Sequence, residues 1–424
     1  MKRNLYIVFL VFLTFFVISL ITNILGPLIP DIIKSFSLSL TMVALLPFSF
    51  FIAYGVMSIP AGMLIEIYKE KATMLVSFVI VLLGSFLFAF FSNYFVAILS
   101  LFLIGMGMAM LQVAINPLLR VAGGEEHFAF NSVMAQLVFG GASFLSPRIY
   151  TYLVQNLSLP PAERPAAVRA LGRLVPDELP WVSLYWVFTL VAAAMVLVIL
   201  LSRFPRVERA EDERVGAWET TLSLFRSRIV VLFFFGIFCY VGTEQGVANW
   251  ISRFLQTYHG YDPQVAGANA VSWFWGLMTA GCLLGLLLLK LFDSRYVLIG
   301  ASVFSMASLT VALFGSGAVA LVAFPAIGFF ISVMWSIVFS LALNSMEKHH
   351  GSFSGILCTG IAGGAVVPLI VGWLGDRLGL RIGMMFLYLT FAYILSIGFW
   401  ARPIISNKTI SLRAQKEQKG SSHA

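Results

Sequence analysis

Glu244 stands out in this chain because it lies inside a long apolar run. The segment 233–250, Phe-Phe-Phe-Gly-Ile-Phe-Cys-Tyr-Val-Gly-Thr-Glu-Gln-Gly-Val-Ala-Asn-Trp, is predicted to form a membrane-spanning helix. A carboxylate at bilayer depth is costly unless it is protonated, paired or hydrated. Most other charges fall in loops and at helix ends, so Glu244 is predicted to bind a proton or a cation. The alternative is a structural acid that is hydrogen-bonded to a neighbouring helix.

Neutral polar side chains on other apolar segments suit a neutral polyol. Amides donate and accept hydrogen bonds to hydroxyl groups, and an indole face stacks on the C–H surface of a sugar. Such side chains also join helices to one another inside membranes, and that alternative stays open for each of them. The predicted substrate-binding residues are Asn23, Gln112, Asn116, Gln136, Gln245, Asn249, Trp250, Asn269 and Trp273.

The composition requires a polytopic membrane protein. The chain has 424 residues, of which 60% are hydrophobic and 11% are charged, and its mean hydropathy is +0.94. A soluble protein of this length could not bury so much apolar surface. Apolar runs of about 20 residues or more predict an all-α membrane protein with twelve transmembrane helices, at 5–33, 41–67, 72–92, 93–121, 128–153, 182–204, 228–258, 266–291, 295–315, 317–346, 352–375 and 380–402.

Proline and glycine predict where these helices break. The sequence Gly26-Pro27-Leu-Ile-Pro30 is expected to loosen the outer part of the first helix, and Gly360, Gly363-Gly364 and Pro368 do the same in the eleventh. A short amphipathic helix is expected at 163–173, in the polar connection after the fifth helix.

The distribution of positive charge predicts the orientation. With twelve helices, the N-terminus, the even-numbered loops and the tail share one side, which carries 19 of the 27 Lys and Arg residues. The positive-inside rule places that side in the cytoplasm. This bias explains the net charge of +8 without nucleic acid as a partner. We expect a monomer in a lipid bilayer, with both termini cytoplasmic, in the plasma membrane of a cell or the inner membrane of a bacterium.

The charged segment 205–227 divides the chain into two halves. We predict an N-terminal six-helix bundle (1–204), a cytoplasmic linker (205–227), a C-terminal six-helix bundle (228–402) and a disordered tail (403–424). Two pseudo-symmetric bundles place a binding site between them near the midplane. Charges near helix ends are candidates for gating, with ordinary interfacial anchoring as the alternative: Glu66, Lys69, Arg295, Asp376 and Arg377.

Catalytic motifs are absent from the sequence. It has no Gly-x-Ser-x-Gly, no His-rich metal cluster and no phosphate-binding loop. The 28-residue stretch after the fifth helix is too short for an independent catalytic domain. The chain is therefore predicted not to be an enzyme and to need no cofactor, with H⁺ or Na⁺ as the coupling ion.

Several segments share one family pattern: Leu-Gln-Val-Ala-Ile-Asn-Pro at 111–117, Cys-Tyr-Val-Gly-Thr-Glu at 239–244, Phe-Trp-Gly-Leu-Met at 274–278, Ile-Val-Phe-Ser-Leu-Ala at 337–342, and the runs 363–368 and 372–376. In this order they resemble the major facilitator superfamily and, within it, the fucose/galactose/glucose:cation symporter family. The resemblance implies two six-helix bundles that carry a hexose-like sugar by alternating access, with symport of H⁺ or Na⁺.

The departures from the family pattern bear on coupling. The acid expected in the first helix falls at Gly26, and the acid expected in the fourth falls at Gln112, while Glu244 is retained. The arginine expected after Gly281 is replaced by Cys282. Coupling is therefore predicted to depend on Glu244. The alternatives are an uncoupled uniporter or exchanger of a sugar or another neutral solute, and efflux of an amphipathic compound.

Overall fold

The computed structural model describes residues 4–124, 128–204, 223–346 and 350–404. Most of the predicted linker and tail lies outside these ranges, and the side chains of Glu66 and Asn116 are not among those described. The described ranges are helical and contain no β-strand, which confirms the all-α prediction. The helices of the first half are α1 (Leu5–Thr22), α2 (Leu25–Phe36), α3 (Leu40–Phe90), α4 (Tyr94–Gly123), α5 (Phe128–Leu157), α6 (Ala166–Leu171) and α7 (Ser183–Leu201).

The second half follows the same plan with more interruptions. Its elements are α9 (Arg228–Ala248), α10 (Ile251–His259), the π-helical turn η4 (Pro263–Gly267), α11 (Ala268–Leu291), α12 (Ser294–Phe314), α13 (Gly317–Ile331), α14 (Met334–Leu343), α15 (His350–Thr359), the 3₁₀ turn η5 (Gly360–Ala362), α16 (Gly363–Leu378), α17 (Leu380–Met385) and α18 (Leu387–Trp400).

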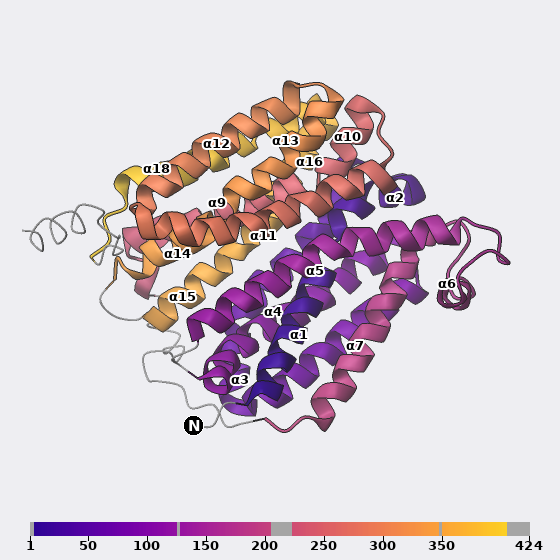
Figure 1. The fold of residues 1–424 in the computed structure, drawn as a ribbon, viewed down its shortest axis with the longest axis horizontal. Coiled ribbons are helices and arrows are strands. Elements are labelled where there is room, and N and C mark those ends of the chain that lie inside the picture. Colours follow the sequence, from indigo (N-terminus) through magenta and orange to yellow (C-terminus); the bar gives the residue numbers. More distant parts are fainter. Residues whose placement is uncertain (1–3, 125–127, 205–222, 347–349, 405–424) are drawn as a thin grey trace, which may run out of the picture.

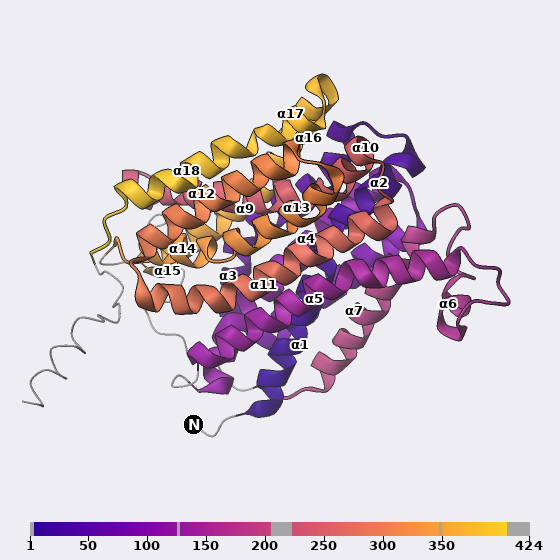
Figure 2. The same ribbon diagram turned by 45° about the horizontal axis from the view of Figure 1, so that its top comes forward.

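The two halves form two bundles that lie side by side (Figure 1, Figure 2). Among the described residues, eleven helical segments are long and apolar enough to cross a membrane. The one predicted helix that is not among these eleven, at 128–153, corresponds to α5, which is 30 residues long and packs against α1 and α11. The short helix expected after it is present as α6.

Both ends of the described chain lie on one side of the bundle. The Asn4 N–H donates to the Ala122 carbonyl at 3.0 Å, where α4 finishes, and the Ile404 N–H donates to the Asn344 carbonyl at 2.8 Å, just after α14. We call this side the terminal end and the opposite side the far end. An even number of crossings requires this arrangement.

One of the two predicted helix breaks is confirmed and the other is displaced. The eleventh predicted helix is interrupted at η5, which begins at Gly360. The first breaks at Asn23, before Gly26-Pro27 rather than at it. Pro27 falls in the first turn of α2, where a missing N–H costs nothing because these groups have no intrahelical acceptor.

Other predicted boundaries need correction. The turn between the second and third predicted helices is a single residue, Lys69, with φ 66° and ψ 169°, inside the continuous run of α3. The predicted helices at 228–258, 317–346 and 380–402 were expected to be unbroken, and that was wrong. They divide into α9 and α10, α13 and α14, and α17 and α18.

Hydrogen bonds join the two halves at the far end. The Asp376 carboxylate of α16 accepts from the Leu40 and Thr41 N–H groups, each at 2.8 Å, at the start of α3. It therefore caps a helix of the other half. Arg148 of α5 donates to the Ser272 hydroxyl of α11 at 3.2 Å. The far end is closed by these contacts.

The rotation of α9 is set by close packing against α16. A Cβ added to Gly363 would collide with the Phe238 carbonyl of α9, and one added to Gly242 would collide with the Val367 side chain. Small residues allow this close approach of helix backbones. With α9 held in this way, Glu244 faces the space between the halves.

We predict that Gly363→Val destabilises the protein by about 1–3 kcal/mol or more, because overpacking forces the helices apart. The measurement is thermal unfolding of the purified chain. Gly355→Val is the matched control, since an added Cβ there meets nothing within 4 Å. Equal unfolding temperatures for the two variants would contradict this account of the packing.

Candidate binding cavity between the halves

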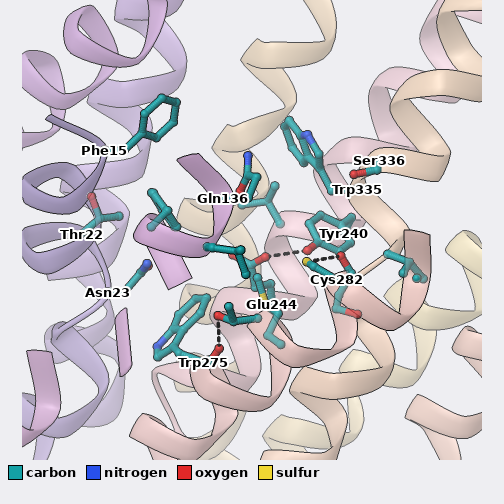
Figure 3. A pocket seen from close by; sticks show the side chains of 18 of the residues that line it. Phe15, Thr22, Asn23, Gln136, Tyr240, Glu244, Trp275, Cys282, Trp335 and Ser336 are labelled. Carbon is teal, nitrogen blue, oxygen red and sulfur yellow. Dashed lines mark hydrogen bonds between the residues drawn. The ribbon is translucent and has the colours of Figure 1, made fainter. Parts of the chain in front are cut away.

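A cavity of about 480 Å³ lies between the two halves (Figure 3). Its wall includes α1, α4 and α5 of the first half and α9, α11 and α14 of the second. It extends from Asn23 and Trp275 toward Gly285 and Leu289, near the terminal end of α11. The polar and aromatic lining residues are Phe15, Thr22, Asn23, Phe51, Tyr54, Gln112, Ser132, Gln136, Phe139, Tyr240, Glu244, Gln245, Trp275, Thr279, Cys282, Ser332, Trp335 and Ser336.

Glu244 is the one charged side chain among the described residues that line this cavity. Its Oε2 accepts from the Tyr240 hydroxyl at 2.8 Å, and its Oε1 accepts from the Gln245 amide at 3.1 Å. Tyr240 lies four residues earlier, on the same face of α9. Both donors are neutral. They satisfy the oxygens without cancelling the charge, so a bound proton or cation would be the neutralising group.

Aromatic side chains flank the carboxylate. The Tyr240 and Trp335 rings are 5.9 Å apart between centroids, and Trp275 lines the wall on another side of Glu244 (Figure 3). Amide groups of Gln112 and Gln136 come from the opposite half. Apolar faces combined with a few polar groups are typical of a pocket for a small organic molecule, and these groups suit one with hydroxyl substituents.

Comparison with known proteins decides the family. The model of the Major Facilitator Superfamily matches residues 11–368. This chain belongs to that superfamily. Its members are transporters, which confirms the prediction that the chain is a transporter rather than an enzyme.

Relatives within the superfamily carry sugar-transporter names. The chain is 31% identical to the glucose/galactose transporter of Brucella abortus, over 91% of this chain and 92% of that protein. It is 27% identical to the L-fucose-proton symporter of Escherichia coli, over 86% of each. The crystal structure of the Escherichia coli fucose:proton symporter superimposes with a TM-score of 0.67 at 22% identity, covering 95% of this chain and 100% of that one. The resemblance to the fucose/galactose/glucose family is thereby confirmed.

Four of the nine predicted substrate-binding residues lie in the cavity of this superfamily member. Gln112, Gln136 and Gln245 line it, as does Asn23. The Asn23 amide nitrogen donates to the Ser143 hydroxyl at 2.8 Å, so that group already has a partner within the first half. Gln136 keeps an exposed side chain in the cavity.

Four others lie outside it. Asn249 and Trp250 are buried where α9 ends and α10 begins, so they leave the face of α9 that carries Glu244. The Trp250 indole donates to the Pro368 carbonyl at 3.3 Å. Asn269 is exposed. Trp273 is 49% exposed because it points about 200° around α11 from Trp275.

None of the aromatic residues that line the cavity was among the predicted site residues, and three of them, Tyr240, Trp275 and Trp335, flank Glu244. Tyr240 could have been found from its spacing of four residues before Glu244. Trp275 shares the spacing of one helix face with Thr279 and Cys282. For Trp335 we find no local signal, because its position depends on the break between α13 and α14.

The predicted helix-end charges have separate roles in the structure. Arg295 pairs with Asp293 at 3.2 Å at the start of α12. Burial acts to raise the pKa of Asp293, but the hydrogen bonds and charge of Arg295 outweigh it and lower the pKa. Lys69 forms the turn described above. Arg377 lies over the Trp373 ring, 4.5 Å from its centroid, while Asp376 caps α3.

We predict that Trp250→Ala lowers stability by about 3–5 kcal/mol, because it empties a fully buried aromatic site. Trp373→Ala is the control, since Trp373 is 44% exposed. Thermal unfolding of the two purified variants measures the difference. If Trp250→Ala were as stable as Trp373→Ala but no longer bound ligand, Trp250 would be a substrate-binding residue and this account of it would be wrong.

Proposed function

We propose that this protein is a symporter that carries a hexose-like sugar by alternating access, with H⁺ or Na⁺ bound at Glu244. The observation that carries the proposal is the Glu244 carboxylate, held by neutral donors, in a cavity shared by both halves. The relatives named as glucose/galactose transporters and as an L-fucose-proton symporter support a sugar as the substrate.

The proposed role of Glu244 follows from charge. With a proton or Na⁺ bound, the carboxylate is neutral and the loaded cavity passes from one side of the membrane to the other at lower cost. The ion that crosses 100 mV supplies roughly 2.3 kcal/mol. This corresponds to about 50-fold accumulation of the sugar, since roughly 1.4 kcal/mol is a factor of ten.

The amides and aromatic rings take the sugar in this scheme. Gln112 and Gln136 of one half and Gln245 of the other bind ring hydroxyls, and Trp275 or Trp335 packs on the C–H face. Because the two halves both contact the sugar, binding favours the conformations in which they are close together.

The orientation is part of the proposal. Positive charge favours a cytoplasmic terminal end, in the plasma membrane or a bacterial inner membrane, for a monomer surrounded by lipid. The cavity reaches toward that end while hydrogen bonds close the far end. The structure is accordingly interpreted as the inward-facing state.

A second candidate is facilitated transport without an ion. It is favoured by Gly26 and Gln112, where the related symporter pattern has acids. Uptake of sugar that never exceeds equilibrium and ignores both pH and Na⁺ would select this alternative.

We predict that Glu244→Gln abolishes uphill uptake of glucose or galactose in proteoliposomes and keeps exchange of sugar at equilibrium. The amide is neutral at every pH, so it mimics the ion-bound form but cannot release the ion. Glu163→Gln, at an exposed position in the connection before α6, is the control and should transport normally. If Glu244→Gln kept uphill uptake with its full dependence on the pH or Na⁺ gradient, Glu244 would not be the coupling residue.

A further inference from the structure

Arg148 lies where α5 of the first half runs beside α11 of the second, along the outside of the molecule (Figure 1, Figure 2). We call this line of contact the seam. Arg148 is exposed and is not among the residues that line the cavity. Leu145 and Tyr152, one helical turn away on either side, are 40% and 51% exposed. The three residues share one face of α5, and an exposed face of a membrane-spanning helix contacts lipid.

Hydrogen bonds near the far end give the depth of Arg148. The hydroxyl of Thr151, three residues closer to that end, donates to the Gln264 carbonyl at 2.6 Å. Gln264 belongs to the turn η4, which connects α10 to α11 at the far end. At 1.5 Å per residue, Arg148 is about 4.5 Å inside the level of this turn. The headgroup layer on each side of a bilayer is about 5–7 Å thick, so Arg148 lies at the depth of lipid headgroups.

Both halves hold the Arg148 guanidinium in place. It is 4.3 Å from the centroid of the Phe144 ring and 5.9 Å from that of Trp273 in α11. Aromatic rings attract a cation at these distances. The Nε–H donates to the Ser272 hydroxyl of α11 at 3.2 Å. The two helices touch here, since a Cβ added to Gly276 would collide with the Phe144 ring. The guanidinium is therefore fixed at the seam while its side chain stays exposed.

The charge of Arg148 has no carboxylate partner in the part of the chain that the structure describes. There, Nε–H is the one of its five N–H groups that has an acceptor. Two acids of the far end have other partners. Asp31 accepts from the Tyr150 hydroxyl at 2.5 Å and from the Gln264 amide at 3.1 Å, and Asp262 accepts from the Gln264 N–H at 2.8 Å. A charge beside lipid is costly when it is unpaired, so an anion from outside the chain would stabilise Arg148.

We propose that Arg148 binds the phosphate of an anionic phospholipid at the seam, in the leaflet on the side of the far end. A guanidinium matches phosphate geometry, because it donates two parallel N–H bonds to two oxygens. Toward the middle of the membrane, the acyl chain would follow Leu145 and Gly141, where an added Cβ meets nothing within 4 Å. Trp273, which is 49% exposed, flanks the headgroup, as tryptophan does at membrane interfaces. A lipid held here contacts both halves.

The test is lipid binding to the purified full-length protein in a non-ionic detergent. The probe is dioctanoyl-phosphatidylglycerol, titrated and followed by native mass spectrometry. Two comparison ligands separate its parts: dioctanoylglycerol has the chains without the phosphate, and inorganic phosphate has the anion without the chains. We expect the phospholipid to bind about ten-fold more tightly than either, because charge-assisted hydrogen bonds and chain burial act together.

Variants of Arg148 assign the site. Arg148→Gln should bind the phospholipid about ten-fold less tightly, because the amide can still donate to Ser272 but lacks the charge and the two-pronged geometry. Arg148→Lys keeps the charge and should recover part of the affinity, which a folding defect would not allow. Arg377→Gln is the matched control. Arg377 also lies over an aromatic ring, that of Trp373 at 4.5 Å, but it is at the end of α16, and its variant should bind like the parent.

Three results would overturn the proposal. The first is equal phospholipid affinity in the parent and in Arg148→Gln. The second is an equal loss in Arg377→Gln, which would indicate attraction to surface charge in general. The third is binding of dioctanoylglycerol or inorganic phosphate as tight as that of the phospholipid. The assay contains no sugar, so its outcome is independent of whether the protein carries one.

Discussion

A carboxylate inside an apolar bundle needs hydrogen-bond donors, and α9 supplies them to Glu244. Glu244 obtains one donor from its own helix, through Tyr240, and one from its neighbour Gln245. The rotation of α9 that presents these groups to the cavity depends on close contact with α16 at Gly363. A packing constraint between two helices thereby determines where a single negative charge is held.

The far end follows a different principle. There the halves are joined by carboxylates that reach from one bundle to the other: Asp31 to Gln264, and Asp376 to the first turn of α3. Each of these bonds exists only while the bundles touch. The Glu244 carboxylate lies in the cavity, where it can contact a bound ion or substrate. The Asp31 and Asp376 carboxylates lie outside it, where they hold the two halves together at the far end. The two kinds of site are connected through α16, which carries Asp376 and also packs against α9 at Gly363.

Composition and apolar run length were sufficient to predict the all-helical fold, and the isolated charge drew attention to Glu244, which lines the cavity. The amides at Gln112, Gln136 and Gln245 could be found because they face inward on regular helices. Asn249 and Trp250 could not be placed, since α9 ends at Ala248, two residues after Gly246, and the break itself has no proline or glycine. Asp31 carried no signal at all, because its partners Tyr150 and Gln264 are more than a hundred residues away.

Gly26 shows how backbone packing limits which residue a position on the first helix can hold. It occupies the position where the family pattern has an acid, and it lies against the end of α9, so that any Cβ would collide with the Ala248 carbonyl. An acidic side chain introduced there would collide with the end of α9 in the closed bundle. The junction of α9 and α10 would have to move first. The backbone contact at Gly26 thus prevents this position from holding the acid of the family pattern while α2 and α9 keep their present arrangement.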